Sequence, residues 1–119
     1  MFQKSNRLRK NDEIVKTIKK GVNLKTPFFN IKFLKTNKEF RIAIVISKKT
    51  IKKAVDRNRI KRIFRAEIRN FLNKEKEKNP EFQLKWDFVF FPSKNCLGKK
   101  SYELNEFIEE VFEKIFKKN

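Results

Sequence analysis

The sequence predicts an α/β (α+β) fold in which a small mixed sheet of about four strands packs with three helices. Three observations support this prediction. The chain has 119 residues, which suits one hydrophobic core and hence a single domain spanning residues 1–119. Fourteen phenylalanines and a hydrophobic content of 39% separate it from disordered chains of similar charge. Segments with helical apolar spacing and segments with strand-like alternation both occur along the chain.

The charge of the chain is strongly one-sided. Lys and Arg number 32 against 14 Asp and Glu, so the net charge is +18. A charge of this size speeds association with polyanions and favours binding through counterion release, which makes nucleic acid the expected partner. Residues 101–119 hold five glutamates, so the basic surface is expected to exclude them.

Several kinds of site and partner are excluded by what the sequence lacks. One cysteine and no histidine exclude an intramolecular disulfide, the usual zinc sites and histidine-based acid–base chemistry. Cys96 is expected to be a packed, unreactive thiol. The N-terminus lacks the apolar core of a signal peptide, and no apolar run reaches membrane-spanning length. We therefore expect a cytoplasmic protein with no membrane partner.

The first elements are a short helix and an edge strand. Residues 1–10 lack periodicity and are expected to form a flexible basic arm. A helix is predicted from Asn11 to Lys20, because Asn11 suits the N-cap and Gly21 suits the C′ position that ends a helix. So short a helix persists only if its apolar face packs on the rest of the protein. Residues 22–24 predict a short edge strand.

Two alternating segments follow and predict a hairpin. In residues 28–35, Phe and Ile fill one face, while Phe28, Asn30 and Lys32 lie on the other. Residues 40–47 alternate in the same way, and the short turn between the segments predicts that they pair directly. Small residues of the second strand leave a shallow trough beside Asn30 and Lys32, in which a strand of nucleic acid could lie. Coverage of this face by a helix is an equal alternative.

The basic segment from Ser47 to Arg69 is the most distinctive part of the chain. Nine of its first nineteen residues are Lys or Arg, and only Asp56 opposes them. On a helix this segment has an apolar face opposite a basic one. The basic face carries Asn58, Arg62, Arg65 and Arg69, with Arg57 and Arg59 on its flanks. A solvated helix usually mixes charges at i, i+4, so a face of one sign indicates a polyanion, and forked guanidinium donors suit phosphate.

The rest of the chain completes the sheet and adds a helix. Alternating Lys and Glu continue the basic helix until Pro80 ends it. Residues 86–91 are apolar on both faces except at Asp87, which predicts a strand covered on both sides. A parallel crossover from the 40–47 strand through the basic helix to this strand fits the order of elements. Ser101 suits the N-cap of a last helix, whose apolar stripe is expected to be core.

The triplet Arg57-Asn58-Arg59, within residues 54–65, resembles the signature motif of the protein subunit of bacterial ribonuclease P. The resemblance extends over nearly the whole chain, from Asn6-Arg7-Leu8 to the amphipathic last helix, in the same order and with the same spacing. It implies a two-layer α/β sandwich. It also implies that the β-α-β crossover around the basic helix is left-handed, against the usual rule for such units.

The resemblance further implies a division of labour in the maturation of tRNA. A large RNA subunit uses bound Mg²⁺ to cleave the 5′ leader from precursor tRNA, and the protein is not the catalyst. The protein binds that RNA and, in a cleft between the basic helix and the sheet, the single-stranded leader, with no obligate protein partner. The residues expected to bind the RNA subunit are Lys48, Lys49, Lys53, Arg57, Asn58, Arg59, Lys61, Arg62, Arg65 and Arg69.

Two departures from the family pattern bear on the leader cleft. The family often has aromatic residues where this chain has Ile14, Ile18 and Lys32, so charge is expected to contribute more here than stacking, which is worth about 1–3 kcal/mol per base. Phe28, or an aromatic residue of the last strand, is a candidate substitute. The expected cleft residues are Ile14, Ile18, Phe28, Asn30 and Lys32. A basic residue common after the last strand is replaced by Pro92-Ser93, which leaves Lys94 as the nearest positive charge.

Two other functions compete with this one. Charge, size and fold would suit a ribosomal or other structural RNA-binding protein equally well, and only the segment around Arg57-Asn58-Arg59 separates the two. A protein-only nuclease would need clustered carboxylates to hold metal ions. Five of the 14 acidic residues lie on the last helix and the others are scattered, which disfavours such a nuclease.

Overall fold

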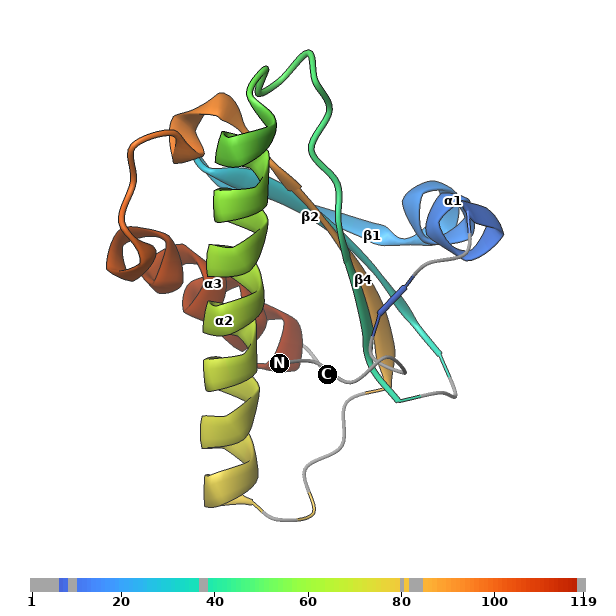
Figure 1. Ribbon diagram of the computed structural model, residues 1–119. Helices are drawn as coiled ribbons and strands as arrows, with labels where there is room; N and C mark the ends of the chain where they lie inside the picture. The colour runs from blue at the N-terminus through green and yellow to red at the C-terminus, as the bar shows by residue number, and fades with distance from the viewer. Residues whose placement is uncertain (1–6, 9–10, 37–38, 80, 82–84, 118–119) are drawn as a thin grey trace.

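The computed structural model describes residues 7–8, 11–36, 39–79, 81 and 85–117. Its elements in chain order are α1 (Asn11–Lys20), β1 (Val22–Lys25), β2 (Phe29–Lys35), β3 (Arg41–Ile44), α2 (Ala54–Lys78), β4 (Trp86–Pro92), the 3₁₀ helix η2 (Lys94–Cys96) and α3 (Ser101–Lys117) (Figure 1). The four strands form one mixed sheet in the order β1-β2-β4-β3, which confirms the predicted α+β fold. Of the helices that the structure describes, none is long and apolar enough to cross a membrane.

The centre of the sheet is occupied by β4, between β2 and β3. It pairs antiparallel with β2 and parallel with β3. The predicted direct pairing of residues 28–35 with 40–47 is therefore wrong, whereas the predicted parallel crossover from β3 through α2 to β4 is confirmed. The physical reason is burial, because Phe88, Val89 and Phe90 are each 0% exposed, and a strand apolar on both faces gains most at the centre of a sheet. The hairpin of this fold is formed by β1 and β2.

One face of the sheet is covered by α2 and α3, and α1 lies on the other side (Figure 1). Phe64 of α2 shows how the core between them is packed. It is fully buried, and its ring centroid lies 5.4 Å from that of Phe29 on β2 and 5.9 Å from that of Phe90 on β4. Such edge-to-face pairs stabilise a core beyond the area they bury. The predicted stripe of α3 packs in the same core.

The opposite face of the sheet holds α1 through an ion-pair cluster and a capping lysine. Arg41 of β3 donates to both carboxylate oxygens of Asp87, at 2.9 and 2.7 Å, and to Glu13 of α1. The hydrogen bonds to Asp87, above all, raise the pKa of Arg41. Lys32 of β2 donates to the carbonyl oxygen of Ile18 at 3.1 Å, which satisfies one of the free carbonyls at the end of α1. The helix α1 therefore covers part of the face on which the trough was predicted.

Gly21 ends α1 as predicted, but for a different reason. Among the described glycines only Gly98 has a positive φ, of 75°, so Gly21 is not a left-handed cap. A Cβ at Gly21 would lie 2.4 Å from the carbonyl oxygen of Thr17 and 2.7 Å from that of Phe33. The backbones of α1 and β2 approach so closely here that only glycine fits without a shift.

The helix α2 begins at Ala54 and not at Ser47, so the first part of the predicted helix is wrong. Residues 47–51 form a turn in which the Ser47 carbonyl accepts two backbone N–H groups, both at 3.1 Å. Ile51 is 2% exposed and anchors this turn to the core. A run of lysines at the positive end of a helix is unfavourable, which also works against an earlier start. The strand β3 is correspondingly shorter than predicted and ends at Ile44.

Cys96 is buried, as predicted for a packed thiol. Its Sγ donates to the carbonyl oxygen of Phe28 at 3.1 Å, and burial raises its pKa to about 11. The thiolate is the reactive form of cysteine. We therefore expect a disulfide reagent at pH 8 to leave the native protein unlabelled and to label it once it is unfolded in urea. Rapid labelling of the native protein would contradict the burial of this thiol.

Candidate nucleic-acid interface

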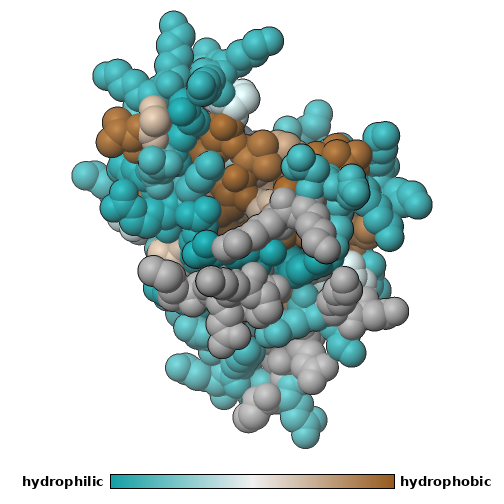
Figure 2. Space-filling model, turned by 45° about the vertical axis from the view of Figure 1, so that its right-hand side comes forward, coloured by the Kyte–Doolittle hydropathy of each residue, from teal (hydrophilic) through white to brown (hydrophobic). Residues whose placement is uncertain are grey.

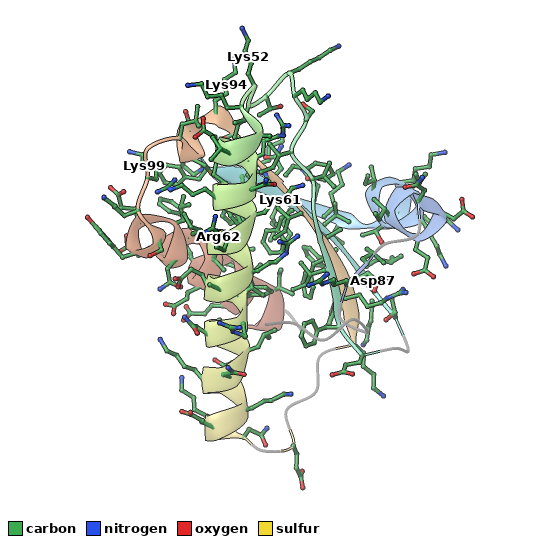
Figure 3. The ribbon with its side chains drawn as sticks, in the orientation of Figure 1. Lys52, Lys61, Arg62, Asp87, Lys94 and Lys99 are labelled. Carbon is green, nitrogen blue, oxygen red and sulfur yellow. The ribbon has the colours of Figure 1, made fainter. Side chains whose placement is uncertain are left out.

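All charged residues of the loop before α2 are lysines, up to the start of the helix. Lys48, Lys49, Lys52 and Lys53 are all exposed. Lys53 is the N-cap residue and has an extended backbone, with no side-chain bond to the helix end. Figure 3 shows Lys52 projecting outward at this end of the molecule. The first turn of a helix already has partial positive charge, so these lysines add repulsion that a bound polyanion would relieve.

The two arginines of the Arg57-Asn58-Arg59 motif fasten neighbouring loops to the start of α2. Nη1 of Arg57 donates to the carbonyl oxygens of Ile51 and Lys52, at 2.8 and 2.7 Å. Nη2 of Arg59 donates to the carbonyl oxygen of Lys99 at 2.8 Å. The sequence predicts outward donors at both positions and does not reveal this positioning role. A guanidinium has five N–H donors, so each arginine can hold its loop and still contact a phosphate.

The basic and apolar sides of α2 lie as its helical spacing predicts. Ile60, Phe64 and Ile68 are each 0% exposed on the core side. The side chains that remain exposed or half-buried on the other sides include those of Asn58, Lys61, Arg62, Arg65 and Arg69. In Figure 3, Lys61 and Arg62 project from different sides of the helix, so the donors form a broad surface and not a single line.

The loop between β4 and α3 adds cations beside the start of α2. Lys94 is exposed on η2, and Lys99 lies next to Arg59, which bonds to its carbonyl oxygen. The Lys99 ammonium also lies 5.7 Å from the centroid of the Phe28 ring, within the range of a cation–π contact. The sequence identifies this stretch as basic, but only the fold brings it to the predicted interface.

Phe28 lies on the core side of the sheet, which corrects the placement expected from strand alternation. A turn at Thr26 delays the start of β2 to Phe29. The Thr26 hydroxyl accepts from the backbone N–H groups of Phe28 and Phe29, at 3.2 and 3.0 Å. The Phe28 ring then packs on Phe107 of α3, with ring centroids 4.8 Å apart. Phe28 is therefore not placed beside Asn30 and cannot line the predicted cleft with it.

A groove of about 380 Å³ lies between α1, β3 and α2. Its lining residues are Arg7, Leu8, Ile14, Ile42, Ala43, Ile44, Val45 and Arg65. Most of them are apolar, and the two arginines are the cations among them. Burial, and next the charge of Arg7, lower the pKa of Arg65. Two cations that repel each other beside an apolar floor suit a ligand with phosphate groups and flat bases.

Arg7 is a further candidate, which the residue pattern of the sequence does not identify. Leu8 is 4% exposed, and its N–H donates to the carbonyl oxygen of Ile42 at 2.9 Å. This short parallel bridge to β3 holds Arg7 at the groove, although residues 1–10 were expected to form a flexible arm. Residues 1–6 and 9–10 lie outside the described part of the chain. The sequence feature that could have indicated this contact is Leu8, an apolar residue between two arginines.

The other residues predicted for the cleft lie on the sheet face opposite the core, or on the helix that partly covers it. Asn30 is exposed, and Lys32 is half-buried because it reaches α1. Ile14 and Ile18 are half-buried on α1. Figure 2 shows hydrophobic surface gathered on this side of the molecule and bordered by hydrophilic side chains. The floor of the cleft is thus more apolar than the sequence predicts.

Several acidic side chains of the described residues pair with cations away from the basic surface of α2. Asp87 is bound by Arg41, and on α3 Glu109 and Glu110 pair with lysines at 3.7 and 3.3 Å. Within the described ranges, no three His, Cys, Asp or Glu side chains are grouped so that they could hold a metal ion. This part of the chain gives no support to a protein-only nuclease.

Comparison with known sequences gives the same family along nearly the whole chain. The family model described as Ribonuclease P matches residues 2–116. The ribonuclease P protein component of Bacillus mycoides is 35% identical over 115 residues, which are 95% of this chain and 93% of that protein. The component of Ureaplasma parvum is 47% identical over 60 residues. That match spans about half of each protein, 50% of this chain and 53% of the relative.

The fold agrees with a solved structure as well. An RNase P protein mutant from Staphylococcus aureus has a TM-score of 0.75 and 25% sequence identity, over 96% of this chain and 90% of that one. The chain therefore belongs to the ribonuclease P family, and the relatives that it matches are ribonuclease P protein components.

Proposed function

We propose that this chain binds the catalytic RNA subunit of ribonuclease P through the basic surface around the start of α2. The observation that carries this proposal is a surface of one sign on a rigid helix, opposed only by Asp56 between residues 47 and 65. The residues proposed to contact the RNA subunit are Lys48, Lys49, Lys53, Arg57, Asn58, Arg59, Lys61, Arg62, Arg65 and Arg69. Phe64 and its neighbours in the core fix the spacing of these donors.

The proposed contacts go mainly to phosphate groups. Arginine forks bind phosphate oxygens in pairs, and the exposed lysines act as point charges. Folded RNA is recognised largely by its shape and backbone, which suits a rigid array of donors. The protein positions the RNA and the substrate, while Mg²⁺ is held mainly by the RNA subunit, where cleavage takes place. We place this work in the cytoplasm, where bacterial tRNA precursors are made.

We place the 5′ leader of precursor tRNA in the groove and on the adjoining open face of the sheet. Ile14 and Ile18 offer apolar surface to the bases, and Asn30 offers a polar group. Lys32 has two roles, because its ammonium also caps α1. Arg7 lines the groove and suits the leader phosphates, while Arg65 lies where the groove meets the surface proposed for the RNA subunit. Phe28 is not included, because its ring packs on α3.

With a bacterial ribonuclease P RNA bound, we expect the protein to bind precursor tRNA more tightly than mature tRNA, because only the precursor carries a leader. Each phosphate contact of the leader should contribute about 0.7 to the slope of log affinity against log salt. The advantage of the precursor should therefore shrink steeply as salt rises. Affinities of both tRNAs across a potassium chloride series would measure this, and cleavage at low Mg²⁺ should rise when the protein is added.

Lys114→Ala is a suitable control, since Lys114 is an exposed cation on α3 that pairs with Glu110. It should leave both tRNA affinities unchanged. Equal affinities for precursor and mature tRNA at low salt would refute the proposed place of the leader. A protein that neither binds nor stimulates a ribonuclease P RNA would refute the proposed interface with the RNA subunit and would favour another structural RNA as the partner.

A further inference from the structure

One aromatic side chain of the central strand lies on the open face of the sheet. In the register of the sheet, Phe91 of β4 is paired with Asn30 of β2, and Asn30 is paired with Lys25 of β1. On the other side, the N–H of Val45 donates to the carbonyl oxygen of Phe90 at 2.9 Å, which continues the pairing of β3 by one residue. Paired residues project to the same face of a sheet. A row across all four strands is thus formed by Lys25, Asn30, Phe91 and Val45.

Phe91 differs from the other phenylalanines of β4 in its surroundings. Phe88 and Phe90 are each 0% exposed, and their ring centroids lie 5.3 and 6.1 Å from that of Phe112 on α3. Phe91 points to the opposite face, is only half-buried and is not part of the core cluster. No ring–ring pair among the described residues includes Phe91. Val89, two residues before it on the same face, is fully buried. Packing of the core therefore does not account for an aromatic ring at this position.

The surroundings of this ring are apolar at the floor and positive at the borders. Lys25 closes the row on one side of the sheet. On the other side Val45 lies in the groove that Arg7 and Arg65 also line. The occupant that matches this pattern is an unpaired nucleic-acid strand, with a base on the ring and phosphates beside the cations.

We propose that Phe91 is a stacking site for one unpaired base of the 5′ leader, an inference that rests on the proposed function. Asn30 is the register partner of Phe91, and its side chain is exposed. The amide of this side chain can donate and accept hydrogen bonds at the edge of a base that stacks on the Phe91 ring. The ring supplies the aromatic surface that Ile14 and Ile18 lack. Stacking on it releases no counterions, so this contribution persists when salt has weakened the phosphate contacts.

The test combines Phe91→Leu with the removal of leader bases one at a time. Precursor tRNAs with a single abasic nucleotide at successive leader positions are bound at high salt to the protein–RNA holoenzyme, with wild-type protein or with the variant. In the wild type, one position should lose about fivefold or more in affinity, as expected for one stacked base. With the Phe91→Leu protein, an abasic nucleotide at the same position should lower the affinity little further, because the ring on which the base stacks is already absent. Phe91→Tyr keeps the ring and should restore the wild-type profile.

Two controls separate stacking from a general effect on the fold. Tyr102→Leu removes another aromatic side chain, 72% exposed at the start of α3, and should leave the abasic profile unchanged. A fluorescent adenine analogue at the sensitive position should be quenched on binding to the wild type and not on binding to Phe91→Leu. Abasic losses that are equal in wild type and Phe91→Leu at every position would overturn the inference. The leader placement itself would stand in that case if precursor tRNA is still preferred over mature tRNA, and both would fall if it is not.

Discussion

Asp87→Ala is expected to lower the free energy of unfolding by about 3 kcal/mol, the lower end of the range for breaking a buried ion pair. The Asp87 side chain is 5% exposed and that of Arg41 is 16% exposed. The substitution therefore leaves a guanidinium that has lost most of its water and keeps only the carboxylate of Glu13 as a charged partner. Urea unfolding followed by circular dichroism would measure the loss, provided that the slope of the transition is unchanged.

Glu13→Ala is the matched control for this prediction. It removes the other carboxylate from the same guanidinium, but at a site where the side chain is 27% exposed, so a loss of about 1 kcal/mol or less is expected. The double variant Arg41→Met with Asp87→Leu should recover much of the stability, because the carboxylate that then loses its partner, that of Glu13, is 27% exposed and can be hydrated. Equal losses for Asp87→Ala and Glu13→Ala would show that burial does not set the strength of this cluster.

Arg65→Ala is expected to weaken binding of the RNA subunit about tenfold or more without destabilising the fold. A hydrogen bond to a charged group contributes about 1.5–3 kcal/mol, and 1.4 kcal/mol corresponds to a factor of ten in affinity. In the free protein, burial and the charge of Arg7 lower the pKa of Arg65, so its removal relieves a repulsion. Loss of function without loss of stability would mark Arg65 as a ligand-binding residue. Affinity for the RNA subunit and the urea midpoint would be measured on the same preparations.

Lys114→Ala removes the same charge from α3 and should change neither quantity. Arg62→Ala, at an exposed position of α2, should weaken RNA binding like Arg65→Ala. Each variant of the basic surface should lower the slope of log affinity against log salt by about 0.7–0.9, the value for one lost phosphate contact. Affinities and slopes that are the same for Arg65→Ala and Lys114→Ala would remove Arg65 from the proposed interface.

The elements of this fold are readable from the sequence, but the neighbours within its sheet are not. The alternation of residues 28–35 and the apolar run of 86–91 identify both strands, because alternation indicates one buried face and an apolar run indicates two. Which strand lies beside which depends on the burial that the whole sheet achieves. Phe88 and Phe90 are fully buried at the centre, so β4 lies between β2 and β3, which are consecutive strands in the chain.

The candidate site shows the same division between local pattern and tertiary contact. The basic side of α2 follows from helical spacing, which fixes the relative directions of Arg62 and Arg65. The groove cannot be predicted from spacing, because it forms only when the contact of Leu8 with β3 brings Arg7 to the edge of that strand. Phe28 was assigned to the wrong face because a side-chain hydroxyl at Thr26 shifts the start of the strand. Local hydrogen bonds of this kind leave no trace in the apolar–polar pattern.

The central strand of the sheet is also the last strand that a ribosome makes. Until residue 92 has emerged, β2 and β3 lack the strand that joins them. The hairpin of β1 and β2 is marginal in water by itself, and α2 has no completed sheet on which to pack. Nearly four-fifths of the chain is therefore synthesised before its sheet can close, and folding depends on contacts between distant parts of the sequence. The nascent basic segment is accordingly an unfolded polycation before it becomes a helix anchored in a core.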